Sequence, residues 1–358
     1  MQRRWGDWDL TLLAAAGLLS VISLVALSSA AATLNPSLVW RQAVWVGVGI
    51  GVGCAVALVP YPRWCDLAPV VYALIVGLLA AVLLAGTVKL GATRWLTVVG
   101  FSLQPSECAK LATALMLARS LANQPRPLSW RALAGSAALV GLPALLIFLQ
   151  PDLGSSSILL AMWLGTVWVA GIAPKHLLAL GGAAAALAPI GWHGLKEFQR
   201  MRLLAFINPH ADPLGAGYTI IQSQIAIGSG GFWGRGWLSG TQSQLNFLPE
   251  RHADFLFSVI GEEWGWWGAV LVVACIGCLV WRALAIALRN SESHGRLLAA
   301  ALASWLGYQA IINIGMVMGV VPVVGVPLPL VSYGGSAMVM TWTAVGLLQS
   351  IRRFGTRF

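Results

Sequence analysis

The stretch "LTLLAAAGLLSVISLVALSSAAAT", residues 10–33, contains no charged side chain in 24 consecutive positions. The apolar core of a secretory signal runs for about 7–15 residues, whereas a helix needs about 20 residues to cross a bilayer. We therefore expect this stretch to be a retained transmembrane helix. Similar runs recur along the whole chain, in which 58% of the residues are hydrophobic and only 9% are charged. This composition is typical of a polytopic membrane protein.

Ten such runs predict ten transmembrane helices, because backbone polar groups in lipid must find their hydrogen-bond partners within the same segment. Their approximate ranges are 10–32, 42–60, 68–88, 104–122, 131–149, 153–171, 175–192, 264–286, 296–318 and 334–351. The predicted fold class is an all-α polytopic membrane protein, in which residues 1–358 form a single integral-membrane domain. The sequence shows no internal repeat, which argues against an inverted-repeat transporter.

The basic residues are scattered singly or in pairs between the apolar runs, although the net charge is +10. This pattern is typical of membrane-topology signals and not of a nucleic-acid surface, so no nucleic-acid partner is expected. With a cytoplasmic N-terminus, 13 of the 22 Lys and Arg residues fall on the cytoplasmic side. Both termini are therefore predicted to be cytoplasmic. Eight of the twelve acidic residues then fall on the outer face, which indicates a polar site facing outward.

One connection, residues 193–263, is much longer than the others. Loops of more than about 15 residues are usually functional or disordered. Aromatic residues are frequent in this segment, and they include Phe198, Phe206, Tyr218 and Trp233. Disordered segments contain few aromatic residues. We therefore predict one large ordered extracytoplasmic loop that folds onto the outer membrane surface.

Four outward-facing patches carry polar residues that could take part in chemistry. The first is "GATRWLTVVGFSLQPSECAKL", residues 91–111, which includes Arg94 and Trp95. Glu107 and Lys110 in this patch are three positions apart on one helical face, so they can pair. An ionisable pair inside a span suggests a function. The alternative is a structural ion pair that locks two helices together.

The second patch is "FLQPDLGSSSILL", residues 148–160, in which Asp152 is either a helix cap or a site residue. The third is the long loop, whose glycines favour turns over a phosphate cradle and whose Arg202 could bind lipid headgroups or a diphosphate. This loop leads into the charged stretch "LPERHADFLFSVIGEEWG", residues 248–265. The fourth patch, "VPLPLVSYGGSAM", residues 326–338, leads into the last helix with small residues. An enzyme acting on a lipid-linked polar substrate and a transporter both fit these residues.

These patches, in this order, resemble the SEDS family (shape, elongation, division and sporulation) of bacterial cell-wall proteins. The matching blocks are "GATRW", "QPSECAKL", "QPDLGSS", "GAGYTIIQSQIAIGSGG", "LPERHADFLFSVIGEEWG" and "LPLVSYGGS". The form "GTQSQLNFLPERHADF" is more similar to the elongation branch, RodA, than to the division branch, FtsW. One departure is Ala253, where the family usually has Thr before the key Asp.

The resemblance implies a peptidoglycan glycosyltransferase that polymerises lipid II for cell elongation and rod shape. The reaction inverts the donor sugar to a β-1,4 linkage and releases undecaprenyl diphosphate. The implied partner is a class B penicillin-binding protein, a transpeptidase that crosslinks the strands. The implied location is the inner membrane of a bacterium, with the active site facing the periplasm or cell exterior. A lipid II flippase and another membrane transporter remain the alternatives.

Asp254 is the catalytic residue that the resemblance implies, either as the general base or as a ligand of a divalent cation, Mg²⁺ or Mn²⁺. A base near the attacking hydroxyl suits a single-displacement inversion. A diphosphate leaving group needs cationic help. The expected substrate-binding or supporting residues are Arg94, Trp95, Glu107, Lys110, Asp152, Arg202, Glu250, His252 and Ser332.

Overall fold

The structure, a computed structural model, describes residues 8–32, 35–85, 87–89, 92–98, 101–215 and 217–355; the side chains of residues 85–94 and 96–102 are not described. The long helices are α1 (Leu10–Ala30), α2 (Ser37–Leu58), α3 (Tyr61–Ala85), α4 (Pro105–Leu121), α5 (Trp130–Leu149), α6 (Leu153–Ala170), α7 (Pro174–Gly194), α11 (Leu256–Arg289), α12 (Ser293–Val317) and α13 (Gly335–Phe354). Shorter elements are the strands β1 (Thr87–Lys89), β2 (Ala92–Val98) and β3 (Phe101–Leu103), the helices α8 (Glu197–Ile207), α9 (Tyr218–Gly230) and α10 (Thr241–Gln244), and the 3₁₀ turn Pro209–Ala211.

Each of the ten predicted apolar runs corresponds to one long helix. Within the described ranges, eight of these helices are long and apolar enough to span a membrane. The other two are α4, which has 17 residues, and α13, which contains Thr341, Thr343 and Gln349. The prediction of a polytopic helical membrane protein is confirmed.

One small sheet, which the sequence analysis did not predict, lies between α3 and α4 in the otherwise helical chain. There β2 pairs antiparallel with both β1 and β3 in a three-stranded sheet. The predicted third span, 68–88, therefore extends too far, because α3 ends at Ala85 and the next residues enter β1. The sequence "ATRWLTV" of β2 is rich in the β-branched and aromatic residues that favour strands. The apolar run continues from the helix into the sheet, so hydropathy alone does not show where the helix stops.

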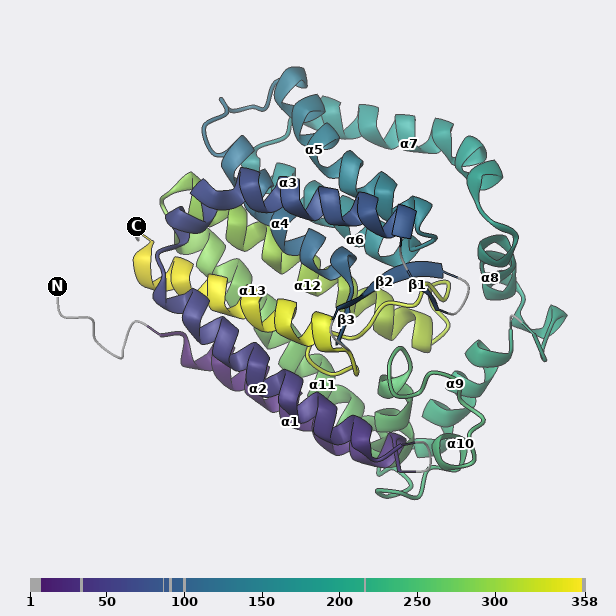
Figure 1. Cartoon of the computed structure of the whole chain (residues 1–358). Helices are drawn as coiled ribbons and strands as arrows, with labels where there is room; N and C mark the ends of the chain where they lie inside the picture. Colours follow the sequence, from purple (N-terminus) through teal and green to yellow (C-terminus); the bar gives the residue numbers. More distant parts are fainter. Residues whose placement is uncertain are drawn as a thin grey trace.

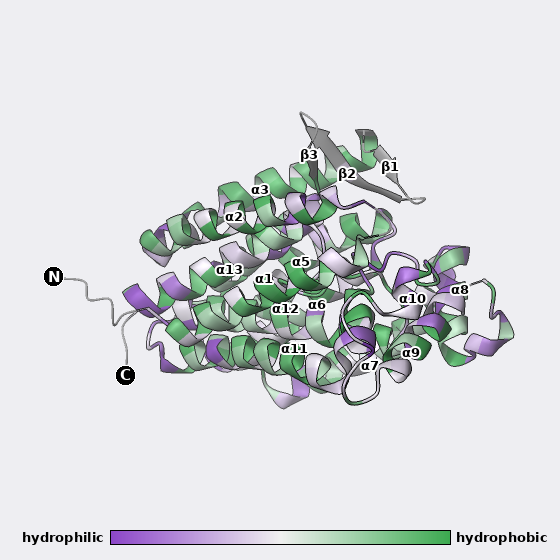
Figure 2. Cartoon of the chain, turned by 90° about the horizontal axis from the view of Figure 1, so that it is seen from below, coloured by the Kyte–Doolittle hydropathy of each residue, from purple (hydrophilic) through white to green (hydrophobic). Residues whose placement is uncertain are grey.

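The long helices lie side by side in one bundle, and the start of α1 and the end of α13 lie at the same end of it (Figure 1). Helices α8, α9 and α10 and the strands lie toward the opposite end. Hydrophobic residues cover most of the length of the bundle, and hydrophilic residues gather toward its two ends (Figure 2). This distribution is the one expected of a protein that crosses a bilayer along the bundle axis.

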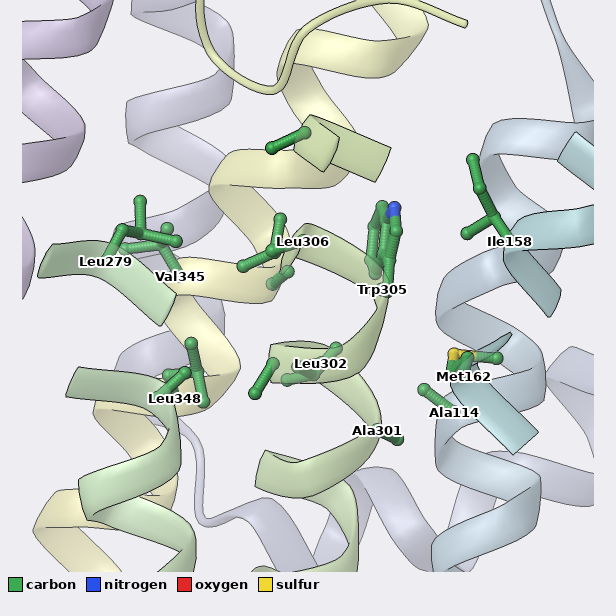
Figure 3. Close-up of a cluster of buried hydrophobic side chains, with 14 of the residues drawn as sticks. Ala114, Ile158, Met162, Leu279, Ala301, Leu302, Trp305, Leu306, Val345 and Leu348 are labelled. Atoms are coloured by element: carbon green, nitrogen blue, oxygen red, sulfur yellow. The ribbon is translucent and has the colours of Figure 1, made fainter. Parts of the chain in front are cut away.

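Helix α12 is the centre of the bundle and packs against α4, α6 and α11. Its Leu302, Trp305 and Leu306 lie between side chains of α6, α11 and α13 (Figure 3). Trp305 is fully buried and donates its indole N–H to Gln309 Oε1 at 2.7 Å. The opposite case is α7, in which His176 is the one buried residue.

The long loop is ordered, as predicted, and it folds into α8, α9 and α10. The helix after it begins at Leu256, earlier than the predicted 264, and is broken at Gly265, where φ is +65°. A Cβ at this position would lie 2.3 Å from the backbone nitrogen of Gly234. Gly265 therefore combines a left-handed conformation with a close approach between two backbones, and both need glycine. The break places the loop residues Gly231 and Gly234 against the start of the spanning part of α11.

Candidate active site

Asp254 lies in the connection between α10 and α11, at the wall of a cavity of about 410 Å³. This cavity is bounded by α8, by the start of α9 and by the connection between α12 and α13. The lining residues are Phe198, Met201, Arg202, Gly215, Thr219, Pro249, Glu250, Asp254, Phe255, Val323 and Gly325. Of the predicted site residues, the structure thus brings Asp254, Arg202 and Glu250 together.

The carboxylate of Asp254 lies against the backbone of Gly325. An ideal Cβ at this glycine would lie 3.3 Å from Asp254 Oδ2, closer than ordinary van der Waals contact. Gly325 also has φ +69°, a conformation that residues with side chains rarely adopt. A side chain at residue 325 would therefore crowd the carboxylate, and glycine avoids this contact.

Asn313 of α12 fixes the backbone on both sides of this contact. Its Nδ2 donates to the carbonyl of Asp254 at 3.0 Å and to the carbonyl of Val326 at 2.7 Å. One turn earlier on the same helix, Gln309 Nε2 donates to the carbonyl of Pro327 at 2.8 Å. Residues four apart lie on one helical face, so α12 holds the connection that carries Gly325 at two points.

Glu107 and Lys110 form the expected pair, and both side chains are buried in α4. Lys110 Nζ lies 2.7 Å from Glu107 Oε2 and donates to Gln309 Oε1 at 2.9 Å. It also lies 5.2 Å from the ring centroid of Trp305. The pair is not among the described residues that line the Asp254 cavity. The pair is linked to the cavity indirectly. Lys110 donates to Gln309, and Gln309 donates to the carbonyl of Pro327, two residues after the lining residue Gly325.

His252 joins the Asp254 connection to the start of α13. Its carbonyl accepts from the backbone N–H of Tyr333 at 3.0 Å, and its ring centroid lies 5.8 Å from that of Tyr333. The His252 Nε2 lies 3.7 Å from Glu250 Oε2. Burial lowers the pKa of His252 below its usual value of 6.5, and the nearby Glu250 only partly opposes this effect. The imidazole is therefore neutral at pH 7.

Two further charged residues of this stretch have structural contacts. Arg251 is buried, and its Nε donates to the carbonyl of Ala30 at 2.7 Å, which ties the stretch to the end of α1. Glu262 accepts from the backbone N–H groups of Gln242 at 2.8 Å and Ser243 at 3.1 Å, at the start of α10. A carboxylate at that position satisfies N–H groups that have no partner inside the helix.

Asp152 and Ser332 are buried away from the cavity lining. Asp152 is the N-cap of α6, and its Oδ1 accepts from the Ser155 backbone N–H at 3.1 Å. Ser332 Oγ accepts from the backbone N–H of Leu328 at 2.8 Å, within the turn that precedes α13. Trp95 lies on β2 and is half-buried. Arg94 lies on the same strand, and its side chain is outside the described part.

The described residues contain no group of three or more His, Cys, Asp or Glu side chains that could hold a metal ion. Asp254 and Glu250 nevertheless line the same cavity. Mg²⁺ is usually bound by one or two carboxylates together with substrate phosphates, and not by a complete protein cage. The two carboxylates therefore fit a cation that arrives with a diphosphate substrate.

The cavity combines three kinds of surface. Asp254 supplies a carboxylate that can accept a proton, and Arg202 supplies a guanidinium suited to phosphate oxygens. Phe198, Phe255 and Val323 form an apolar wall beside them. Such a site fits an amphipathic substrate that carries a hydroxyl nucleophile or an anionic leaving group.

The sequence of this chain is similar to that of a known protein family and to several of its members. Residues 7–357 match the family model of FtsW, RodA and SpoVE, described as cell cycle proteins. The chain is 44% identical over 292 residues to the peptidoglycan glycosyltransferase MrdB of Escherichia coli K12, which covers 81% of this chain and 78% of that protein. It is 33% identical to the peptidoglycan glycosyltransferase RodA of Treponema pallidum, over 87% of this chain and 88% of that protein.

Solved structures extend the similarity to three dimensions. A chain from a peptidoglycan synthase complex superposes with a TM-score of 0.85 at 36% identity and covers 98% of both chains. The crystal structure of the Thermus thermophilus rod shape determining protein RodA gives a TM-score of 0.74 at 31% identity, again over 98% of both chains. Sequence and fold agree over almost the whole length, and the chain belongs to the FtsW/RodA/SpoVE family of cell cycle proteins, the SEDS family that its sequence blocks resemble.

Proposed function

We propose that this chain is a peptidoglycan glycosyltransferase that polymerises lipid II into glycan strands for cell elongation, with the Asp254 cavity as its active site. One observation carries the proposal: a carboxylate, a guanidinium and an apolar wall meet in one cavity of about 410 Å³. MrdB and RodA, both named as peptidoglycan glycosyltransferases, support the reaction class. The resemblance of the Asp254 stretch to the RodA branch supports elongation.

In the proposed reaction, the 4-hydroxyl of the acceptor sugar attacks the anomeric carbon of the donor chain. The bond from that carbon to the diphosphate breaks, and undecaprenyl diphosphate leaves with the bonding electrons. A single displacement converts the α-linked donor to a β-1,4 linkage. Asp254 takes the proton of the attacking hydroxyl, the role of a general base. The Asn313 hydrogen bond to the Asp254 carbonyl fixes the backbone that carries this carboxylate, and the carboxylate itself lies against Gly325.

The diphosphate gains negative charge as it leaves and needs a cationic partner. Arg202 is the guanidinium in the cavity wall, and its Cζ lies 5.8 Å from the ring centroid of Phe198. Arg94 is proposed as a second helper on the basis of the family resemblance alone. In the alternative role of Asp254, Asp254 and Glu250 would hold a Mg²⁺ or Mn²⁺ ion, and that ion would supply the positive charge that the diphosphate oxygens need.

The proposal includes an orientation and a partner. Both termini are inferred to be cytoplasmic and the Asp254 cavity to face the periplasm or cell exterior, because short basic loops favour the cytoplasm. Arg63, Arg131 and Arg296 lie at the bundle end that carries the start of α1, opposite the cavity.

The inferred protein partner is a class B penicillin-binding protein. The similar chain in a peptidoglycan synthase complex supports this partner.

The test is glycan synthesis by purified Asp254→Asn protein supplied with lipid II and its partner. The substitution keeps the size of the side chain but removes the base, so the rate is expected to fall by about 10²–10⁴-fold. Glu197→Gln is the matched control, since Glu197 is an exposed acid in the first turn of α8 that does not line the cavity. The control is expected to polymerise at the wild-type rate.

Both variants must show the wild-type melting temperature for the comparison to be valid. Wild-type synthesis by a folded Asp254→Asn protein would exclude Asp254 as the base and would overturn the mechanism proposed here. A separate experiment measures glycan synthesis by the wild-type protein after divalent cations are chelated. Full activity after chelation would assign the diphosphate charge to Arg202 and remove the metal from the mechanism.

A further inference from the structure

A second cavity lies at the other end of the bundle, where α11 and α13 end. Its volume is about 80 Å³, and its wall consists of Arg282, Ala285, Ile286, Arg289, Asn290, Ile351, Arg352 and Gly355. A single buried water needs about 10–15 Å³ in this measure. The space can therefore hold a group larger than one water, and three of the eight lining residues are arginines.

The arginines around this cavity differ in their acidic partners. Asp9 is buried, and its Oδ2 lies 2.6 Å from Arg282 Nη2 and 3.1 Å from Arg352 Nη1. One carboxylate thus serves two guanidinium groups. Arg289 is exposed at the end of α11. No acidic side chain in the part of the chain that the structure describes pairs with it.

The cavity borders an apolar surface. Ile286 and Ile351 form part of its wall. Next to it on α11, Trp281 is 69% exposed and Leu288 is 75% exposed. In a membrane-spanning helix, such side chains face acyl chains. A cationic cavity beside a lipid-facing surface has the chemistry to bind an anionic group that is attached to hydrocarbon.

We propose that this cavity binds the phosphate group of an anionic phospholipid, with the acyl chains lying along α11. Arg289 would contact the phosphate directly, and its planar guanidinium suits phosphate oxygens. Arg282 and Arg352, held by Asp9, would supply the positive field. Basic cavities between membrane helices on the cytoplasmic side recognise anionic headgroups in this way. The proposal does not depend on the catalytic function proposed above.

Native mass spectrometry of the intact chain tests the proposal. The protein is released from micelles that contain equal amounts of phosphatidylglycerol and phosphatidylcholine, and the ratio of the two bound lipids is measured. Wild-type protein is expected to retain phosphatidylglycerol preferentially. Arg289→Gln is expected to lower that preference roughly fivefold, the usual contribution of one basic residue near an anionic surface. Arg289 is exposed, so this variant should fold normally.

Arg131→Gln is the matched control, because Arg131 is an exposed arginine at the same end of the bundle and does not line the cavity. It is expected to keep the wild-type preference. Equal preference in the wild-type and Arg289→Gln proteins would overturn the site. A parallel sample contains inorganic phosphate. Bound phosphatidylglycerol that persists there supports a lipid ligand, whereas its replacement by phosphate adducts would overturn the lipid assignment.

Discussion

Gly325 determines how much space the Asp254 carboxylate has. The backbone at Gly325 is left-handed, and a methyl group there would lie 3.3 Å from Asp254 Oδ2. Gly325→Ala is therefore expected to displace the carboxylate by a few tenths of an ångström. Since a misplacement of 1 Å can cost about 100-fold in rate, glycan synthesis is expected to fall by about tenfold. The measurement is the rate of lipid II polymerisation by the purified variant.

Gly171 offers a control for backbone strain. It has φ +96° at the end of α6, and a Cβ there would meet Arg126 only at ordinary distances of 3.6 Å or more. Gly171→Ala should lose stability by about 1 kcal/mol, as alanine does at a left-handed position, and keep its activity per folded molecule. Equal losses of activity in the two alanine variants would show that Gly325 acts only through stability.

Sequence reasoning found some of the cavity residues and could not find others. Asp254, Arg202 and Glu250 are charged residues in an apolar chain, and this made them visible as candidates. Gly325 and Asn313 carry no such signal. Asn313 reaches Asp254 across 59 positions of sequence, so its role exists only in the folded chain. Their contribution to catalysis, like that of the predicted residues, stays a prediction.

At the scale of helices, the buried Glu107–Lys110 pair links α4 to α12 through Gln309. Loss of one partner of a buried ion pair leaves an uncompensated charge and costs about 3–5 kcal/mol. Glu107→Gln and Lys110→Met are each expected to lower stability and glycan synthesis strongly. The double variant should lose less stability and activity than the sum of the single losses, because neither charge is then buried without its partner. Chemical unfolding and polymerisation rates of the four proteins measure this coupling.

The exposed pair at the other end of α4 is the control for this cycle. Arg119 Nη1 lies 3.5 Å from Asp66 Oδ1, and the two side chains are 42% and 81% exposed. Solvent screens such pairs, so Arg119→Gln and Asp66→Asn should give small losses with little coupling. Strictly additive losses at Glu107 and Lys110 would mean that the two residues act independently.

For the whole molecule, the ten long helices were predictable because hydropathy is a local property of the chain. The features that sequence reasoning missed depend on contacts between distant segments. The break in α11 needs Gly265 and Gly234 to meet across the loop. The sheet needs β2 to pair on both sides. Among the short helices, α9 packs against α11 and α12, and α10 packs against α1 and α11, contacts that a run of apolar residues does not show.

The orientation in the membrane is a property of the whole chain, and it can be tested with single cysteines. Asp212→Cys places an exposed thiol in the long loop, and Arg131→Cys places one at the opposite end of the bundle. After the five native cysteines are replaced, an impermeant maleimide added outside the cell membrane should label only position 212. Position 131 should react only after the membrane is permeabilised, because short loops rich in Lys and Arg stay cytoplasmic.

Labelling of position 131 from outside, with position 212 protected, would mean the opposite orientation in the membrane. The Asp254 cavity would then face the cytoplasm. Lipid II that had already crossed the membrane could not reach it there, so the polymerase proposal would have to be abandoned. The anionic-lipid proposal would survive, since binding at Arg289 depends on local charge and not on the side of the membrane. Labelling at the two positions therefore separates the consequences of the two proposals.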